Sequence, residues 1–428
     1  MKLKPQFGLT ITILTILFVA PTMVKADAVS DWNLIALQRI GAAVPARPAP
    51  VGFLDMAIVN AAMYDAVQAI EKDYQQYHAQ IPGASGSPEV AAAKAAHDVL
   101  VNLFPGQTAT IDTAYNDYLT AKSLSPVDPG VAVGAAAAAQ IIALRSNDGR
   151  FPAVDPPFTG GLDAGQWRPT PSFLGAPPSP PSFAPMAAPW VANVTPFTLN
   201  SGDQFRAAPP PPLNSSEYTQ AYNEAKLMGA RVGSGRTPEE TTFALFWAAN
   251  YTALWNRVAR ELAASQNLNI SDNSRLFALL TFSMADAIIT AWDSKVAYNF
   301  WRPLTAIREG DYDTNPDTVG DPLWEPLINT PNYSDHTSGA NNASGAATRA
   351  LSLFFGTNEM TFTVTTTNAA LGTPAPTRTY QKFSDAAEDV VVARIYEGIH
   401  FRFADEDARK QGRHVAQWAH GHFLKPIE

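Results

Sequence analysis

The residues of this chain that are best suited to chemistry lie in three short segments of its C-terminal third. Each segment supplies groups that can hold a tetrahedral oxyanion: positive charges, a hydroxyl, or a backbone N–H that no side chain shields. These groups belong to Lys295 and Arg302, to Ser338 and Gly339, and to Arg394 and His400. The imidazole of His400 adds a nitrogen that could attack phosphorus or bond the central metal of an oxyanion. Together the segments predict a site for a phosphate-like anion.

The order and spacing of these segments resemble one superfamily, the vanadium-dependent haloperoxidases and type 2 phosphatidic acid phosphatases. Its pattern is Lys, six residues, Arg-Pro; then Pro-Ser-Gly-His; then Ser-Arg, five residues, His, three residues, Asp. The corresponding residues here are Lys295 and Arg302-Pro303, then Thr337-Ser338-Gly339-Ala340, then Ala393-Arg394 and His400. The resemblance extends from about residue 31 to the C-terminus.

The sequence departs from that pattern at four places. Thr337 stands where the pattern has Pro, Ala340 where it has His, Ala393 where it has Ser, and Ala404 where it has the last Asp, with Asp405 one place late. Ala340 matters most. The resemblance implies that the His at this place is the acid–base group in both branches, a role worth about 10² to 10⁴ in rate. Alanine cannot deliver a proton.

His336 lies four residues before Ala340 and could replace the missing group. The loop would have to fold back to bring its imidazole to the same place. Related sequences often carry an Asp-His pair here in addition to the motif His. A structural role for His336 is therefore favoured, and a catalytic role is the alternative.

The resemblance also implies roles for the remaining residues. The equatorial oxygens of the anion would be bound by Lys295, Arg302, Ser338, Gly339 and Arg394. His400 would bond the central atom, which is the vanadium of vanadate in a haloperoxidase and phosphorus in a phosphatase. Trp292 and Tyr333 occupy places where haloperoxidases carry aromatic residues near the halide, and core packing is the alternative for both.

Helix geometry makes a prediction for the first segment. Lys295 and Arg302 are seven positions apart, which is close to two helical turns. One continuous helix would place them on one face, about 10 Å apart. Pro303 would then discourage further helix.

The other two segments need a helix start and a helix break. Ser338 and Gly339 precede a run of small residues, so we expect Ser338 to be the N-cap of a helix whose first N–H groups point at the anion. Arg394 and His400 would be about 120° apart around an unbroken helix and could not share a ligand. Gly398 lies between them and predicts a break.

The N-terminus indicates export. Residues 1–26 read as a secretory signal with a basic start, a short apolar core from Leu9 to Ala20, and cleavage near Ala26. No later stretch approaches the roughly 18 to 20 uninterrupted apolar residues of a membrane span. We therefore expect a secreted or periplasmic protein without a stable membrane anchor.

Composition excludes several partners and chemistries. The formal net charge is −9, which argues against nucleic acid and anionic membrane surfaces as partners. The chain has no cysteine, which excludes disulfides, thiol chemistry and thiolate metal sites. With 46% hydrophobic residues, there is enough apolar chain for a large core or two fused ones.

Periodicity predicts an all-α fold of two helical bundles within residues 27–428. Helices are expected at 56–70, 88–104, 109–124, 131–144, 217–227, 238–255 and 274–301. Residues 151–213 hold 16 of the 35 prolines together with several aromatic residues, so an ordered extended loop should cover the core there. The second bundle would carry the oxyanion site, within residues 274–424.

Three functions fit these observations. The first is a secreted vanadium-dependent haloperoxidase-like protein that uses vanadate, hydrogen peroxide and a halide, impaired by Ala340. The second is an acid phosphatase with His400 as nucleophile, a phosphate ester as substrate and no cofactor. The third is an oxyanion-binding protein without turnover. Both a monomer and a homo-oligomer are compatible with each function.

Overall fold

The computed structural model describes residues 27–153, 157–171 and 183–427. Within those ranges the chain forms thirteen α-helices, four short 3-10 helices and one two-stranded sheet. The prediction of an all-α fold built from helical bundles is confirmed. The predicted signal, residues 1–26, lies outside the described residues.

The first five helices pack together as the N-terminal bundle. They are α1 (Ala28–Gly41), α2 (Val51–Glu71), α3 (Pro88–Leu103), α4 (Thr108–Lys122) and α5 (Gly130–Arg145), with the 3-10 helix η1 (Pro105–Gln107) before α4. All of α2 except its last two residues is buried, and α2 contacts α1, α3 and α5. Small residues allow this close packing, since a Cβ on Gly134 would collide with the carbonyl oxygen of Ala91. The sequence predicted four of these helices and missed α1.

A long extended segment separates the two halves of the chain. Between α5 and α6 the described residues form only the 3-10 helix η2 (Pro189–Asn193). The buried carboxylate of Asp286 accepts hydrogen bonds from the backbone N–H of Phe197 at 2.6 Å and of Thr198 at 2.7 Å. Arg145 donates to the carbonyl oxygen of Thr195 at 2.7 Å. These bonds tie the segment to α9 and to α5.

Eight helices and a hairpin form the second half of the chain. The helices are α6 (Ser216–Gly229), α7 (Pro238–Trp247), α8 (Tyr251–Ser265), α9 (Ile270–Tyr298), α10 (Pro303–Arg308), α11 (Gly339–Phe354), α12 (Phe383–Tyr396) and α13 (Arg402–His422), with η3 (Gly310–Tyr312) and η4 (Ala369–Leu371). The prediction of one helix over 238–255 is wrong. Asn250 ends it by capping a new helix, its side-chain oxygen accepting from the N–H of Ala253 at 3.1 Å.

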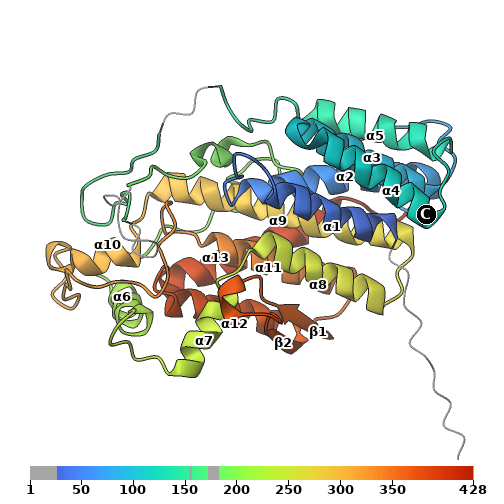
Figure 1. Cartoon of the computed structure of the whole chain (residues 1–428). Helices are drawn as coiled ribbons and strands as arrows, with labels where there is room; N and C mark the ends of the chain where they lie inside the picture. Colours follow the sequence, from blue (N-terminus) through green and yellow to red (C-terminus); the bar gives the residue numbers. More distant parts are fainter. Residues whose placement is uncertain (1–26, 154–156, 172–182, 428) are drawn as a thin grey trace, which may run out of the picture.

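Helix α9 is the central element of the fold. Figure 1 shows it running between the N-terminal bundle and the helices α11 and α13, and it packs against α2, α11 and α13. Among the described helices it alone is long and apolar enough to cross a membrane, but 94% of its apolar window is buried inside the protein. α9 is therefore the core helix that both halves share.

A β-hairpin that the sequence did not predict packs beside α8 and α12. It consists of β1 (Glu359–Thr365) and β2 (Thr377–Lys382), paired antiparallel with Phe362 opposite Tyr380. The rings of Phe362, Tyr380 and Phe383 stack and cover the start of α12. The hairpin lies outside the site described below.

Candidate oxyanion-binding site

Lys295 fixes a loop against the end of α9. It lies in the last turn of that helix and is fully buried. Its Nζ donates to the carbonyl oxygens of Ser334 at 2.6 Å and Asp335 at 3.0 Å, and the Ser334 hydroxyl donates back to the Lys295 carbonyl oxygen at 2.8 Å. Burial lowers the pKa of Lys295 well below its ordinary value, and the charge of Arg302 lowers it further. A bound anion would reduce the free-energy cost of burying this cation.

The prediction that Lys295 and Arg302 share one continuous helix is wrong. α9 ends at Tyr298, because Asn299 adopts a left-handed φ of 47°. Arg302 is the N-cap of α10, and Pro303 begins that helix instead of preventing it. Proline suits the first position of a helix, where its missing N–H costs nothing. The two cations are brought together by the turn between α9 and α10, and not by a shared helix face.

Arg302 is fully buried and only partly satisfied by the protein. Its Nε donates to the carbonyl oxygen of Tyr333 at 2.7 Å, and its Nη1 donates to that of Ile399 at 2.6 Å. Nη1 also lies 3.1 Å from Nε2 of His400. Its Nη2 is buried without a hydrogen-bond partner among the described residues. Such an unsatisfied group is costly unless a ligand accepts from it.

The predicted break between Arg394 and His400 is confirmed. α12 ends at Tyr396, and Gly398 adopts a φ of 77°. A Cβ on Gly398 would also collide with the backbone of α6. Glycine is required here by both its φ and its space. The turn leaves His400 just before α13, so that its direction no longer follows the helix that carries Arg394.

A carboxyl group occupies one side of Arg394. Its Nη1 forms an ion pair with Oε2 of Glu397 at 2.6 Å, and both side chains are buried. Burial raises the pKa of Glu397 to about 7, although the charge of Arg394 opposes that shift. The Nε of Arg394 has no hydrogen-bond partner among the described residues. Arg394 therefore keeps donor capacity for a ligand.

Asp335 orients the imidazole of His400. Nδ1 of His400 lies 2.8 Å from Oδ1 of Asp335, and both groups are buried. Burial lowers the pKa of His400 well below its ordinary value, and the charges of Arg302, Lys295 and Arg394 lower it further. Burial raises the pKa of Asp335 to about 7, against the opposing effect of the nearby cations. An ionised carboxylate only accepts, so it requires the proton on Nδ1 and leaves Nε2 with its lone pair.

Helix α11 begins beside these groups. Ser338 is its N-cap, as predicted, but the Ser338 side chain caps no backbone N–H. Asn341 donates to Oδ1 of Asp405 at 2.7 Å and lies 3.5 Å from the Ser338 hydroxyl. A Cβ on Gly339 would lie 3.3 Å from the ring of Trp292, so glycine lets that ring reach the start of the helix. The first N–H groups of a helix have no helical partners and favour an anion.

The assembled groups fit a tetrahedral oxyanion. The charges of Arg302 and Arg394 lower the pKa of Lys295, and the charge of Arg394 lowers the pKa of Arg302, so like charges repel within the site. An anion would offset this repulsion and accept from Nη2 of Arg302 and Nε of Arg394. Vanadate and phosphate both have this shape and charge. No group of three or more His, Cys, Asp or Glu within the described ranges could hold a bare metal cation instead.

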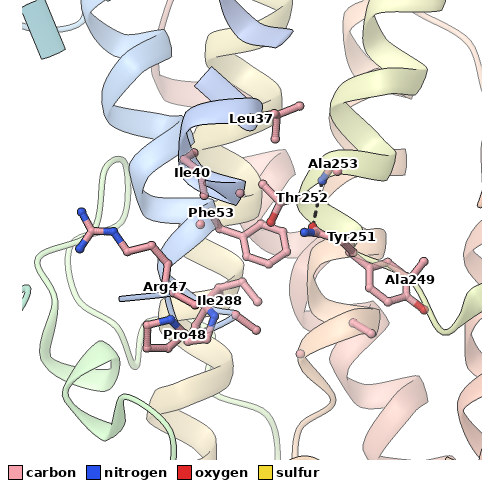
Figure 2. A pocket seen from close by; sticks show the side chains of 18 of the residues that line it. Leu37, Ile40, Arg47, Pro48, Phe53, Ala249, Tyr251, Thr252, Ala253 and Ile288 are labelled. Carbon is pink, nitrogen blue, oxygen red and sulfur yellow. Dashed lines mark hydrogen bonds between the residues drawn. The ribbon is translucent and has the colours of Figure 1, made fainter. Parts of the chain in front are cut away.

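A cavity of about 460 Å³ opens onto the oxyanion site. Its walls come from α1, α2 and the turn between them, from α8, and from α9 (Figure 2). The residues that line it include Phe53, Tyr251, Trp292, Tyr333, Gly339, Ala340 and Arg394. Figure 2 shows the guanidinium of Arg47 turned away from the cavity, where it pairs with Asp55. The wall is therefore mainly apolar and aromatic, and Arg394 adds a cation to it.

Comparisons with known proteins agree with this geometry. Residues 275–428 match a sequence model described as the VCPO second helical-bundle domain. The vanadium chloroperoxidase of Curvularia inaequalis is 29% identical over 165 residues, which cover 33% of this chain and 26% of that protein. The second half of the chain is therefore similar in sequence to the second helical-bundle domain of the vanadium-dependent haloperoxidases. Its match thus spans about a quarter of that curated relative.

Solved structures show how far the shared fold extends. The crystal structure of a bacterial vanadium-dependent iodoperoxidase has a TM-score of 0.76 and 24% identity, covering 93% of this chain and 98% of that one. An apo-type bacterial vanadium-dependent chloroperoxidase has a TM-score of 0.71 and 17% identity, covering 87% and 92%. The fold that this chain shares with these two structures therefore includes its N-terminal bundle as well as its second half.

The structure separates Ala340 from His336. Ala340 lies on the cavity wall in the first turn of α11. His336 is not part of that wall: its Nε2 lies 2.9 Å from the carbonyl oxygen of Ala208, and its ring packs between Tyr298 and Phe403. Burial lowers the pKa of His336 to about 4, so it is uncharged near neutral pH. These surroundings match the structural role.

The two aromatic residues lie on the cavity wall. Trp292 and Tyr333 have ring centroids 5.0 Å apart, and Nε1 of Trp292 donates to the carbonyl oxygen of Ala187 at 3.1 Å. Nζ of Lys295 lies 4.9 Å from the centroid of the Tyr333 ring, and Cζ of Arg302 lies at the same distance. The ring faces thus help to hold the two cations in place.

Sequence reasoning missed three buried carboxyl groups at the site. Asp335 and Glu397 contact His400 and Arg394, and Asp405 contacts Asn341. The local sequence carries little signal for them, since Asp405 stands beside Glu406 and Asp407 and the burial of all three carboxyl groups depends on the tertiary fold. A carboxyl group is rarely buried unless it is paired.

Proposed function

We propose that this chain is a secreted, vanadium-dependent haloperoxidase-like protein. The observation that carries the proposal is the neutral His400, oriented by Asp335 at 2.8 Å, among three buried cations, of which Arg302 and Arg394 each retain a donor without a partner in the described ranges. The anion would be held by Lys295, Arg302 and Arg394, with Ser338 and Gly339 at the start of α11, and His400 would bond vanadium. Vanadate, when bound, supplies the activation of hydrogen peroxide that allows a halide to be oxidised.

The chain's own residues would prepare this chemistry in two ways. Asp335 keeps a proton on Nδ1 of His400, so that Nε2 carries the lone pair, which would bond vanadium in place of its 3.1 Å contact with Nη1 of Arg302. The cations supply charge that is fixed before the ligand arrives, on side chains that the fold buries. Halide and peroxide would enter through the cavity, past Trp292 and Tyr333.

Ala340 limits turnover in this proposal. No described imidazole lines the cavity, and the carboxyl groups of Asp335 and Glu397 are engaged with His400 and Arg394. The reaction would therefore lack a positioned proton donor, which is worth about 10² to 10⁴ in rate. This observation favours a second candidate, an oxyanion-binding protein with little turnover.

A phosphatase remains the third candidate, because the same groups would serve phosphoryl transfer. Nε2 of His400 would attack phosphorus, and the P–O bond to the alcohol would break. The leaving alcohol would need a proton that position 340 cannot supply. The cavity of about 460 Å³ would hold the alcohol part of such an ester.

One set of assays separates the three candidates. The purified full chain is stripped of vanadate, divided, and reloaded with vanadate or left untreated. Each half is assayed for bromide and iodide oxidation with peroxide, and for hydrolysis of p-nitrophenyl phosphate. The proposal expects slow halide oxidation that needs vanadate. Hydrolysis by the untreated half would favour the phosphatase, and vanadate binding without either reaction would favour the binding protein.

Two variants show whether the assigned site is responsible. His400→Ala and Arg394→Ala should each weaken vanadate binding measured by calorimetry. Equal binding by both variants and the native protein would refute the assignment. Export is tested separately, by N-terminal sequencing of the protein recovered outside the cytoplasm, which should begin near Asp27.

A further inference from the structure

A second basic hollow lies away from the site above. It has a volume of about 250 Å³ and is formed where α11, α12 and α13 meet the turn before β1. The residues that line it are Thr348, Arg349, Ser352, Asn358, Ser384, Ala387, Arg409 and Arg413. Arg349 comes ten residues after Gly339 on α11, which is about 15 Å along the helix axis. The hollow is therefore distinct from the oxyanion site at the start of α11.

The charges of this hollow are poorly balanced. The side chains of Arg349 and Arg413 form no ion pair or hydrogen bond with another residue in the described ranges. Arg409 pairs with Glu388, but its Nε is buried without a partner there. Three arginines thus face one paired carboxylate, in a chain whose formal net charge is −9. An isolated surface arginine is usually just solvated, whereas three around one concave site raise the local anion concentration.

The remaining groups of the hollow are hydrogen-bonding groups held in place. The side chain of Asn358 donates to the Ser384 hydroxyl at 3.0 Å and accepts from the Ser384 N–H at 3.1 Å. Ser352 has no hydrogen bond to another described residue, and its hydroxyl is free for a ligand. The close packing of α11 on α13 fixes the arginine positions, since a Cβ on Gly345 would collide with the backbone of Arg409.

We propose that this hollow binds a tetrahedral oxyanion group, either phosphate or sulfate. Arginine forks match the oxygens of such groups better than lysine, and each charge-assisted bond is strong. The volume suits one such group with some water, and the open edge would allow the group to be part of a larger molecule. An anionic polymer outside the cell and the free inorganic anion share this chemistry, so the experiment compares both.

The test uses the full chain and isothermal titration with sodium sulfate and sodium phosphate. Ionic strength is held constant with chloride, because exposed charges are screened by salt. The double variant Arg349→Gln/Arg413→Gln should bind sulfate at this site about a hundredfold more weakly, from two lost charge-assisted bonds. The matched control is Arg257→Gln, which removes an exposed arginine from α8 that pairs only with Glu261.

Dextran sulfate and neutral dextran separate the two sources of the anion. Binding of dextran sulfate far tighter than that of sulfate, lost in the double variant, would identify a sulfated polymer. Similar binding per sulfate group would identify the free anion. Unchanged sulfate and phosphate affinities in a folded double variant would overturn the proposal. If that variant does not fold, the exposed Arg413→Gln alone should still lose about tenfold in affinity.

Discussion

Replacement of Ala340 by histidine should raise turnover without changing oxyanion affinity. Ala340 lies in the first turn of α11, on the wall of the cavity and beside Gly339. The cavity of about 460 Å³ has room for an imidazole at that place. Ala340 is half-buried and lines this space, so the new side chain can extend into the cavity.

The size of the effect follows from proton transfer and from the local charges. A positioned acid–base group contributes about 10² to 10⁴, so the gain should be at least about 2.7 kcal/mol in activation free energy. The nearby cations, including Arg394, would lower the pKa of the new imidazole, and a bound anion would raise it again. The helix itself should lose only about 0.5 kcal/mol, because histidine is a poorer helix former than alanine.

The assay measures vanadate-dependent bromide oxidation and phosphate-ester hydrolysis, with vanadate affinity determined on the same samples. Ala340→Gln is the matched control, because it fills similar space without a titrating group. It should leave the rate low. The reasoning would be refuted by a native protein with full activity that Ala340→His does not improve and His336→Ala abolishes. That result would mean that His336 carries the proton.

Three further predictions test the binding groups. Arg302→Lys should weaken vanadate binding by tenfold or more in calorimetry, because a planar fork becomes a point charge, and an unchanged dissociation constant would mean that Arg302 does not touch the anion. Asp335→Asn should lower vanadate affinity or activity by about 10- to 100-fold, since an amide can also donate to Nδ1 and no longer fixes the tautomer of His400, and equal values would contradict that role. Glu397 has a pKa raised to about 7 by burial, so it is neutral below that pH and ionised above it, where it competes with the anion for Arg394. Vanadate affinity should therefore fall as pH rises through about 7, by up to about tenfold per pH unit. Glu397→Gln should flatten this pH dependence. Parallel pH curves for the native protein and the variant would contradict the prediction.

The sequence predicted which residues form the site better than it predicted the backbone structure that positions them. The order of Lys295, Arg302, Arg394 and His400 follows one pattern, and the break at Gly398 follows from helix geometry because six positions cannot share one face. The continuous helix from Lys295 to Arg302 was wrong. Its end depends on Asn299 in a left-handed conformation, which local propensity allows but does not require.

The buried carboxyl groups could not be predicted from local patterns. Asp335 contacts His400 across 65 positions of sequence, so only the tertiary fold brings them together. Burial also sets their protonation, and burial depends on the packing of α9, α11 and α13. The hairpin of β1 and β2 was not predicted for a similar reason. Its two strands are short and partly exposed, and their packing against α12 decides their conformation.

The division between the two halves of the chain bears on what the protein can act upon. The segment that matches the superfamily's second-domain model, residues 275–428, contains every cation of the oxyanion site and His400. Most of the cavity wall comes from elsewhere, including Phe53 of α2 and Tyr251 of α8. The proposed oxyanion chemistry thus depends on one part of the chain, while the access and shape above the anion depend on another. Substitutions at Phe53 should therefore change which molecules reach the site and leave oxyanion affinity unchanged, whereas substitutions at Arg302 should do the reverse.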